Sequence, residues 1–213
     1  EMRISMGKDA VKAAKAAGYE NAGTVEFIVD GGNYYFIEMN TRLQVEHPVT
    51  EMITGINIVK QQLRIASGLP LEITQEDVEF SCHAIECRIN AEDIFNDFAP
   101  SPGHVSFLHF PLGNQVRVES ALYSGCDISP FYDSMVAKII VCGSTRLEAI
   151  RRMRRALEET IIQGIKTTLP IQFLIMYNRE FLRGNYDTGF VEKNMAELLK
   201  LYEEAGGRDE SVQ

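Results

Sequence analysis

The sequence lacks an apolar run long enough to cross a membrane. Its most apolar stretch runs from Met135 to Cys142 with Lys138 inside it, whereas a bilayer-spanning helix needs about 20 such residues. The N-terminus, Glu1 to Ile4, has neither an initiator methionine nor an apolar signal region, so we interpret it as a cut inside a longer protein. With 45% hydrophobic and 24% charged residues, the 213-residue chain has the composition of an ordinary globular protein without a membrane span.

Basic residues are outnumbered by acidic ones. The 21 lysines and arginines against 30 aspartates and glutamates give a formal net charge of −9, which argues against a partner with a phosphate backbone. The main basic cluster lies in a helix-like stretch and consists of Arg151, Arg152, Arg154 and Arg155. We expect this cluster to form a solvated helix face, and we predict no nucleic-acid partner.

Cysteine is scarce, and the four cysteines lack the paired C-x-x-C spacing of a zinc site. The chain is also too large to depend on disulfides for its stability. We therefore predict reduced thiols and a cytoplasmic location for the protein. The four thiols belong to Cys82, Cys87, Cys126 and Cys142.

The most informative feature that is present is an alternation of polar residues ahead of His47-Pro48. In a strand successive side chains point to opposite faces, so the alternating residues would all project from one side. Such a mixed polar face is costly to bury unless it holds something charged, which makes it a candidate site. The alternative is an edge strand with one solvated face. The alternating residues are Glu38, Asn40, Arg42, Gln44 and Glu46.

The length of this polar column divides its chemistry. Extended at about 3.3 Å per residue, its ends would be roughly 26 Å apart, too far for one small ligand. Either the segment bends or the two ends serve different groups. We expect a metal and phosphate near Glu38 and Asn40, and a small anion near Arg42, which can grip a planar oxyanion while Glu46 acts as a base.

The strand register of a predicted hairpin determines whether a second carboxylate lies at the metal end. Two β-rich runs, 24–30 and 34–38, flank Gly31-Gly32-Asn33. With an odd loop, Glu26 lies opposite Glu38, and two such carboxylates repel each other unless a cation such as Mg²⁺ lies between them. With a two-residue Gly31-Gly32 turn, Glu26 lies opposite Ile37 instead. The sequence leaves both registers open.

Helical periodicity appears in both halves of the sequence. The first half predicts a helix over Asp9–Ala17 and a boundary near Glu79. After Pro48 it predicts one helix of about four turns, whose apolar positions run from Ile53 to Ala66 and which Gly68 stops. In the second half, Thr145 and Glu148 predict a capping box that starts a helix. Its expected apolar stripe is Leu147, Ile150, Met153, Leu157 and Ile161.

The remaining signals of the second half predict strands and two further helices. Pro170 suits the first turn of a helix that continues over 171–176, another helix covers 190–202, and the polar tail from Gly206 is expected to fray. Strands are predicted over 82–89, 105–110, 115–119 and 135–142, with a turn-rich segment at 99–103.

Several motifs together resemble biotin carboxylase, a member of the ATP-grasp superfamily, and most of all the component that serves bacterial-type acetyl-CoA carboxylase. The resemblance implies an α+β fold: the C-terminal half of an ATP-grasp domain, an antiparallel sheet with helices, over 1–79, and the biotin carboxylase C-terminal α+β domain over 80–192. A helical, frayed tail would follow over 193–213. The motifs are Glu26-Phe27, Phe36 to Glu51, Ile85 to Glu92, Pro130 to Met135 and Gly164 to Thr168.

The resemblance implies a ligase that carboxylates biotin on a carrier protein from ATP and bicarbonate, with carboxyphosphate as the intermediate, in fatty acid biosynthesis. The implied partners are the biotin carboxyl carrier protein, a carboxyltransferase component and a second copy of the chain. The resemblance implies that two Mg²⁺ or Mn²⁺ ions and ATP bind at Glu26, Glu38 and Asn40. Bicarbonate would bind at Arg42, Gln44 and Val45, and Glu46 would be the base. Arg88 would stabilise the enolate-like biotin.

The sequence also departs from the family. The resemblance begins in the middle of the ATP-grasp fold, so the N-terminal domain, the glycine-rich lid and the lysines that hold the nucleotide have no counterpart, and we expect little turnover from the isolated chain. A related carboxylase for pyruvate or another acyl-CoA, and a non-catalytic dimerisation module, remain alternatives. We interpret His47 as structural, and either Glu86 or Asp133 as a partner for Arg88.

Overall fold

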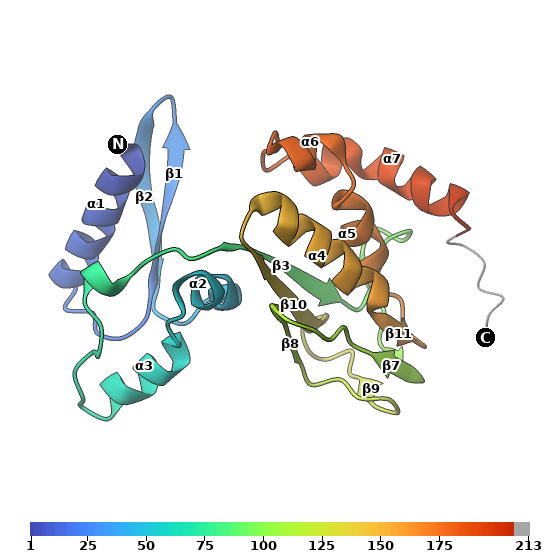
Figure 1. Ribbon diagram of the computed structural model, residues 1–213, viewed down its shortest axis with the longest axis horizontal. Helices are drawn as coiled ribbons and strands as arrows, with labels where there is room; N and C mark the ends of the chain where they lie inside the picture. Colours follow the sequence, from blue (N-terminus) through green and yellow to red (C-terminus); the bar gives the residue numbers. More distant parts are fainter. Residues whose placement is uncertain (207–213) are drawn as a thin grey trace. The chain divides into compact units, whose positions relative to one another are not determined.

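The computed structural model describes residues 1–206 and divides the chain into two compact units (Figure 1). The first unit is Glu1–Phe80, and the second begins at Ser81. Within the described residues, no helix is long and apolar enough to cross a membrane.

The first unit is a helix beside a hairpin, followed by two short helices (Figure 1). The predicted N-terminal helix starts seven residues earlier than expected, and the predicted single helix after Pro48 is wrong because Gly55, at φ 71°, ends the first of two helices. The Asn57 side chain then caps the second by accepting a hydrogen bond from Lys60 N. The elements are α1 (Met2–Ala16), β1 (Thr24–Asp30), β2 (Asn33–Asn40), α2 (His47–Thr54), α3 (Ile58–Ala66) and the 3-10 turn η1 (Gln75–Asp77).

Helix α1 is attached to one face of the β1–β2 hairpin through aromatic and polar contacts. The Tyr34 hydroxyl donates a hydrogen bond of 2.6 Å to Asp9 Oδ2, and this bond raises the pKa of the tyrosine. The ring of Phe27 stands edge-on to those of Tyr34 and Phe36, at centroid distances of 5.5 and 6.3 Å. A cavity of about 420 Å³ remains between this face and the helix. The helix therefore covers the aromatic face and leaves the opposite, polar face of the hairpin open.

The second unit is a three-stranded antiparallel sheet with helices packed on it (Figure 1). The sheet consists of β3 (His83–Asn90), β10 (Met135–Gly143) and β8 (Val116–Ser120), in that order, so β3 and β8 are its edges. Three small antiparallel pairs surround it: β4 (Glu92–Asp93) with β5 (Ala99–Pro100), β6 (Gly103–His104) with β9 (Asp127–Ile128), and β7 (Phe107–His109) with β11 (Ile161–Gln163). The helices are α4 (Arg146–Glu159), α5 (Leu169–Ile175), α6 (Arg179–Arg183) and α7 (Phe190–Glu204).

The main core lies between this sheet and α4. Helix α4 is capped as predicted by the Thr145 side chain, which accepts from Glu148 N, but the Glu148 carboxylate reaches back to Ser144. Ile150, Met153 and Leu157 are buried as predicted, whereas Leu147 is 49% exposed and Ile161 lies in β11 with 42% exposure. The expected stripe was therefore wrong at both ends, because the buried face is completed by Ala149 and Ala156 instead.

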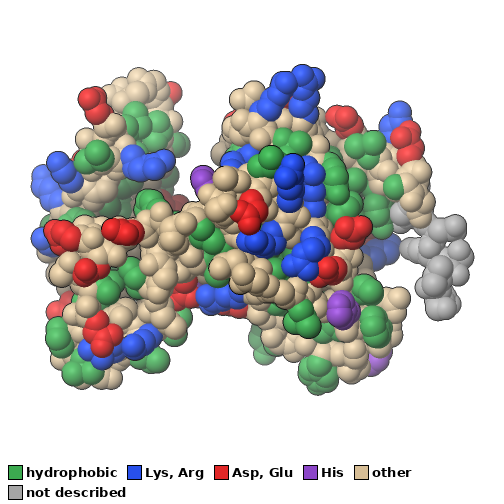
Figure 2. Space-filling model, viewed as in Figure 1, with side chains coloured by type: hydrophobic (Ala, Val, Ile, Leu, Met, Phe, Trp, Pro, Cys, Tyr) green, Lys and Arg blue, Asp and Glu red, His purple; other side chains and the backbone are tan. Residues whose placement is uncertain are grey.

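The basic cluster of α4 is only partly the solvated face that its sequence predicts. Figure 2 shows basic side chains gathered over this helix. Arg151 and Arg155 are exposed, but Arg154 donates from Nε and Nη2 to the Met176 carbonyl at 3.0 and 2.7 Å and covers the Tyr177 ring at 3.9 Å. The prediction was wrong for Arg154 because the carbonyl at the end of α5 is an acceptor that its guanidinium can reach.

Two of the four cysteines are joined, which contradicts the prediction of four reduced thiols. Cys82 and Cys142 form a disulfide with a Cα–Cα distance of 6.2 Å across 60 residues of sequence. The antiparallel pairing of β3 with β10 brings the start of one strand to the end of the other, so the spacing in the sequence does not reveal the pair. Cys87 and Cys126 are free and buried. Burial, and after it the charge of Glu86, raises the pKa of the Cys87 thiol to about 12.

Candidate active site

The hairpin places Glu26 directly opposite Glu38, and it does so through a combination of turn and β-bulge that neither predicted register included. The turn is the two-residue one, since Asp30 pairs with Asn33 across Gly31-Gly32. By itself this turn would set Glu26 against Ile37. A β-bulge shifts the register between Glu26 and Phe27, so that β2 gains one residue and Glu38 moves to the face of Glu26.

Asn40 lies between the two carboxylates and contacts both. Its Nδ2 donates to Glu26 Oε1 at 2.7 Å and to Glu38 Oε1 at 3.2 Å. Both carboxylates are exposed and the amide is half-buried, so this end of the hairpin is open to solvent. Within residues 1–206 no group of three His, Cys, Asp or Glu side chains is placed to hold a metal ion. The oxygen donors at this end of the hairpin are two carboxylates and one amide.

The polar column does not continue as a strand, so the predicted 26 Å extended face is wrong. Strand β2 ends at Asn40 because its partner β1 begins at Thr24, directly opposite, and offers no further backbone pairing. The chain bends instead, which was the other possibility. Hydrogen bonds still connect the next side chains: Arg42 Nη2 donates to Asn40 Oδ1 at 3.3 Å, and Arg42 Nη1 donates to Gln44 Oε1 at 2.5 Å. We call these five connected residues, Glu26, Glu38, Asn40, Arg42 and Gln44, the polar ladder.

The segment after the polar ladder turns into α2. Glu46 is exposed at the N-cap position of α2, Val45 is half-buried, and Pro48 is buried in the first turn. The Gln44 carbonyl accepts from His47 N at 3.3 Å and lies 2.8 Å from His47 Nδ1. His47 therefore fastens the end of the polar ladder to the helix, in line with the structural role that we expected for it.

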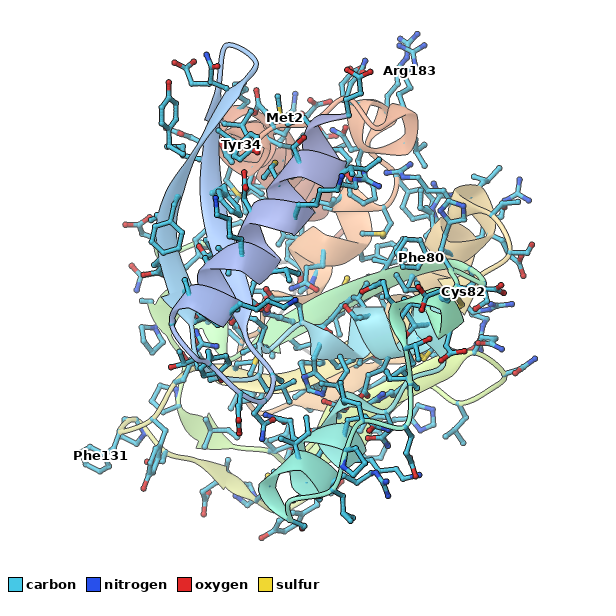
Figure 3. The ribbon with its side chains drawn as sticks, turned by 90° about the vertical axis from the view of Figure 1, so that its left-hand side faces the viewer. Met2, Tyr34, Phe80, Cys82, Phe131 and Arg183 are labelled. Atoms are coloured by element: carbon cyan, nitrogen blue, oxygen red, sulfur yellow. A yellow bond between two sulfur atoms is a disulfide. The ribbon has the colours of Figure 1, made fainter. Side chains whose placement is uncertain are left out.

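Arg88 lies on β3 in the second unit, opposite Lys138 of β10. Its side chain is 47% exposed, and its Nε is 3.9 Å from an oxygen of Glu86, one of its two expected partners. The Asp133 carboxylate accepts from Met135 N at 2.8 Å and so shapes the start of β10. In Figure 3, Phe131 of the same loop projects outward, consistent with its 88% exposure.

Two residues that contact Arg88 were missed by the sequence reasoning. Gln172 Nε2 donates to the Arg88 carbonyl, and Thr168 Oγ1 lies 3.5 Å from the same oxygen. Both contacts bridge about eighty positions of sequence. Thr168 ends the Gly164 to Thr168 motif of the family resemblance, but that motif suggested no contact with Arg88, and no local pattern marks Gln172. Only the position of α5 beside the edge of β3 reveals them.

Two families of known proteins match the chain, one over most of each unit. Residues 1–74 match the family described as Carbamoyl-phosphate synthase L chain, ATP binding domain, so the first unit belongs to a class of ATP-binding domains. Residues 86–193, about half of the chain, match the family described as Biotin carboxylase C-terminal domain. The chain belongs to the biotin carboxylase family. The predicted family and the α+β fold, the C-terminal part of an ATP-grasp domain followed by a biotin carboxylase C-terminal domain, are thereby confirmed.

Individual relatives agree with this assignment. A pyruvate carboxylase component from Methanothermobacter thermautotrophicus is 54% identical over 96% of the chain, and Biotin carboxylase 1 of Bacillus subtilis is 55% identical over 90%. The chain spans only 42% and 43% of these relatives' lengths. A solved structure of the 2-oxoglutarate carboxylase biotin carboxylase domain dimer from Hydrogenobacter thermophilus, in complex with MgADP, ADP and bicarbonate, is 52% identical, with a TM-score of 0.87 over 91% of this chain and 43% of that one.

Proposed function

We propose that this chain supplies the metal-binding and bicarbonate-binding residues for the ATP-dependent carboxylation of biotin, as part of a ligase of the biotin carboxylase type. The observation that carries the proposal is the polar ladder, in which two facing carboxylates are joined through Asn40 to Arg42. The H. thermophilus relative, whose structure contains MgADP and bicarbonate, supports the proposal that a protein of this kind binds both a magnesium-bound nucleotide and bicarbonate.

At the metal end, Glu26, Glu38 and Asn40 would hold two Mg²⁺ or Mn²⁺ ions together with the ATP phosphates. The donor set fits, because hard oxygen ligands suit these ions and one or two carboxylates with substrate phosphates commonly bind Mg²⁺. The Asn40 amide hydrogens now bridge the carboxylates at 2.7 and 3.2 Å, and turning the amide over presents its oxygen to a cation instead. Bound ions would neutralise the charge of the transferring phosphoryl group.

At the anion end, Arg42 would bind bicarbonate. Its guanidinium has five N–H donors, and three of them are used by Asn40 Oδ1, Gln44 Oε1 and the Leu43 carbonyl among the described residues. The Nε–H and one Nη2 hydrogen are left for two parallel bonds to a planar oxyanion. Gln44 holds the guanidinium in place, and Val45 would be the third residue that binds bicarbonate.

The next residue in the sequence, Glu46, would act as the base. It is exposed at the N-cap of α2, so its carboxylate is accessible to a proton on bicarbonate. Carboxyphosphate formed from ATP and bicarbonate would break down to carbon dioxide and phosphate. A deprotonated ureido nitrogen of biotin would then attack the carbon dioxide, with Arg88 stabilising the negative charge on the biotin oxygen.

The partners follow from the same proposal. Biotin would arrive on a carboxyl carrier protein and leave for a carboxyltransferase component, and two copies of the protein would form a homodimer like the H. thermophilus domain dimer. Relatives named for pyruvate and for 2-oxoglutarate are 54% and 52% identical, so the step proposed here is the carboxylation of biotin that precedes any such acceptor. The cytoplasmic location stays a prediction that rests on the consumption of ATP, since the Cys82–Cys142 disulfide removes the argument from four reduced thiols.

The direct test is incorporation of labelled bicarbonate into biotin by the protein that contains this chain. We expect incorporation that requires ATP and Mg²⁺ and that is accompanied by release of phosphate. Failure to incorporate label with ATP, Mg²⁺ and biotin all present would contradict the proposal. A polypeptide limited to residues 1–213 is expected to show no substantial turnover, since the glycine-rich lid and lysines of the family have no counterpart in its sequence.

A further inference from the structure

The geometry at the edge of β3 points to Thr168 and Gln172 as positioning residues that fix Arg88 for its reaction with biotin. Neither residue is placed to touch the substrate in this assignment, because both act on the main chain of Arg88. The inference rests on the proposed function, in which Arg88 stabilises the charge on biotin. It adds two residues that belong to neither the metal end nor the anion end.

The first observation is that β3 is an edge strand at the place where it carries Arg88. Backbone groups on a free edge must find partners outside the sheet. Here the partners come from the start of α5: Asn90 N donates to Thr168 Oγ1 at 3.0 Å, and Thr168 N donates to the Asn90 carbonyl at 3.0 Å. Gln172 Nε2 donates to the Arg88 carbonyl and also to Thr168 Oγ1, the latter at 3.1 Å. Two side chains thus take the place of a neighbouring strand.

The second observation is the direction in which these groups point. In an antiparallel pair the backbone groups of every second residue point away from the partner strand. Arg88 and Asn90 are two residues apart and both bond to the α5 side, so their main chain is held on its outer side by Thr168 and Gln172. The neighbouring residues, Cys87 and Ile89, are 6% and 0% exposed and fix the strand to the core. The Arg88 side chain leaves from the face of the sheet opposite to theirs.

These contacts matter because the Arg88 side chain is long and 47% exposed. Its main chain sets the point from which the guanidinium extends, beside the contact with Glu86. A shift of about 1 Å in a reacting group can cost about 100-fold in rate. Thr168 is only 6% exposed, so its hydroxyl is committed to the strand edge rather than to solvent. Losing either side-chain contact would loosen the Arg88 main chain while leaving the buried core residues in place.

The test uses the complete protein with near-isosteric substitutions. Gln172→Met and Thr168→Val remove the polar groups but keep the volume, and Thr168→Ser restores the hydroxyl. The matched control is Thr167→Val, because the Thr167 hydroxyl accepts from Leu169 N at the start of α5 rather than contacting β3. Two rates are compared for each variant: incorporation of bicarbonate into free biotin, and bicarbonate-dependent ATP hydrolysis without biotin, a reaction in which Arg88 has no assigned role.

We expect Gln172→Met and Thr168→Val to lower biotin carboxylation about 10- to 100-fold through kcat, with ATP hydrolysis within about twofold of the parent. Thr168→Ser and Thr167→Val should carboxylate biotin at nearly the parent rate. Undiminished carboxylation in Gln172→Met and Thr168→Val would overturn the inference, and so would an equal fall in both activities, which signals general damage to the fold. A parent protein without either activity would instead contradict the proposed function.

Discussion

The two units differ in how they hold their residues in place. All of the buried core hydrophobic residues of the described chain lie in the second unit, between Cys87 and Leu198. In the first unit only Pro48 and Glu51 are buried, while Phe36 and Leu63 are 57% and 66% exposed. The polar ladder is therefore positioned by strand register and hydrogen bonds, whereas Arg88 is positioned by a strand that is packed into a core. Changes to the polar ladder should therefore alter chemistry more than stability, and changes to the buried core of the second unit should do the reverse.

The largest expected effect is on activity from the anion end. In the complete protein, Arg42→Ala removes the two donors left for an oxyanion and Glu46→Ala removes the base, so each should lower biotin carboxylation by at least about 100-fold. Both side chains are exposed, and the circular dichroism spectrum should not change. Near-normal carboxylation in either variant would refute the assigned role.

The next largest effect concerns the disulfide of the second unit. Replacing Cys82 and Cys142 by serine removes a crosslink over 60 residues, which by the loop-entropy relation lowers the free energy of unfolding by about 4 kcal/mol. Denaturant unfolding followed by circular dichroism measures the change. Alkylation under native conditions is a companion measurement: we expect no reaction at the buried Cys87, whose pKa is raised, and reaction at Cys82 and Cys142 only after reduction. Labelling of all four cysteines without a reductant would contradict the pairing.

A matched pair of apolar substitutions compares the packing of the two units. Met153→Ala, at a side chain that is fully buried under the sheet, should lower the free energy of unfolding by about 3 kcal/mol. Phe36→Ala, at a side chain that is 57% exposed, should cost less than about 1 kcal/mol. Denaturant titration of both variants against the parent gives the two values. Equal losses would mean that the first unit has a core comparable to that of the second.

The smallest expected effect is a dependence on pH at the start of α4. Hydrogen bonds from the Ser144 hydroxyl and main chain, with the charge of Arg152, hold the pKa of Glu148 below its usual range. A depressed folded-state pKa contributes stability above the unfolded value, and this stability is lost as the pH falls through the folded value. Between pH 6 and about pH 3, the melting temperature of Glu148→Gln should therefore fall less than that of the parent protein. Glu158→Gln, at an exposed position of the same helix, is the control and should follow the parent.

The sequence predicted the family motif, the hairpin and the order of most of the longer elements, but not α6, β11 or the short β4–β5 and β6–β9 pairs. Several other particulars depended on contacts outside the local sequence. The pairing of Glu26 with Glu38 was one of two registers left open, and it results from a β-bulge that the turn residues do not predict. Gly55 divided a helix that apolar spacing alone would continue. The disulfide between Cys82 and Cys142 depends on strand pairing across 60 residues.

The polar residues show the same limit. Alternation marked four of the five polar-ladder residues, whereas Glu26 came from the hairpin and the alternating Glu46 lies outside the polar ladder. It also predicted an extended strand where loss of the partner strand lets the chain bend after Asn40. Arg154 was expected in solvent because a pattern of charges cannot show that a carbonyl from α5 lies within reach. The predicted tail from Gly206 falls largely outside the described residues.

If the polar ladder has a metal end and a bicarbonate end, substitutions at its two ends should change different kinetic constants of the complete protein. Bicarbonate-dependent ATP hydrolysis is measured while Mg²⁺ and bicarbonate are varied independently, for the parent, for Glu38→Gln and for Arg42→Lys. The account predicts that Glu38→Gln raises the Mg²⁺ requirement about tenfold or more with little change in the bicarbonate KM, and that Arg42→Lys raises the bicarbonate KM with little change in the Mg²⁺ requirement. Both variants shifting the same parameter, or neither shifting its own, would contradict it.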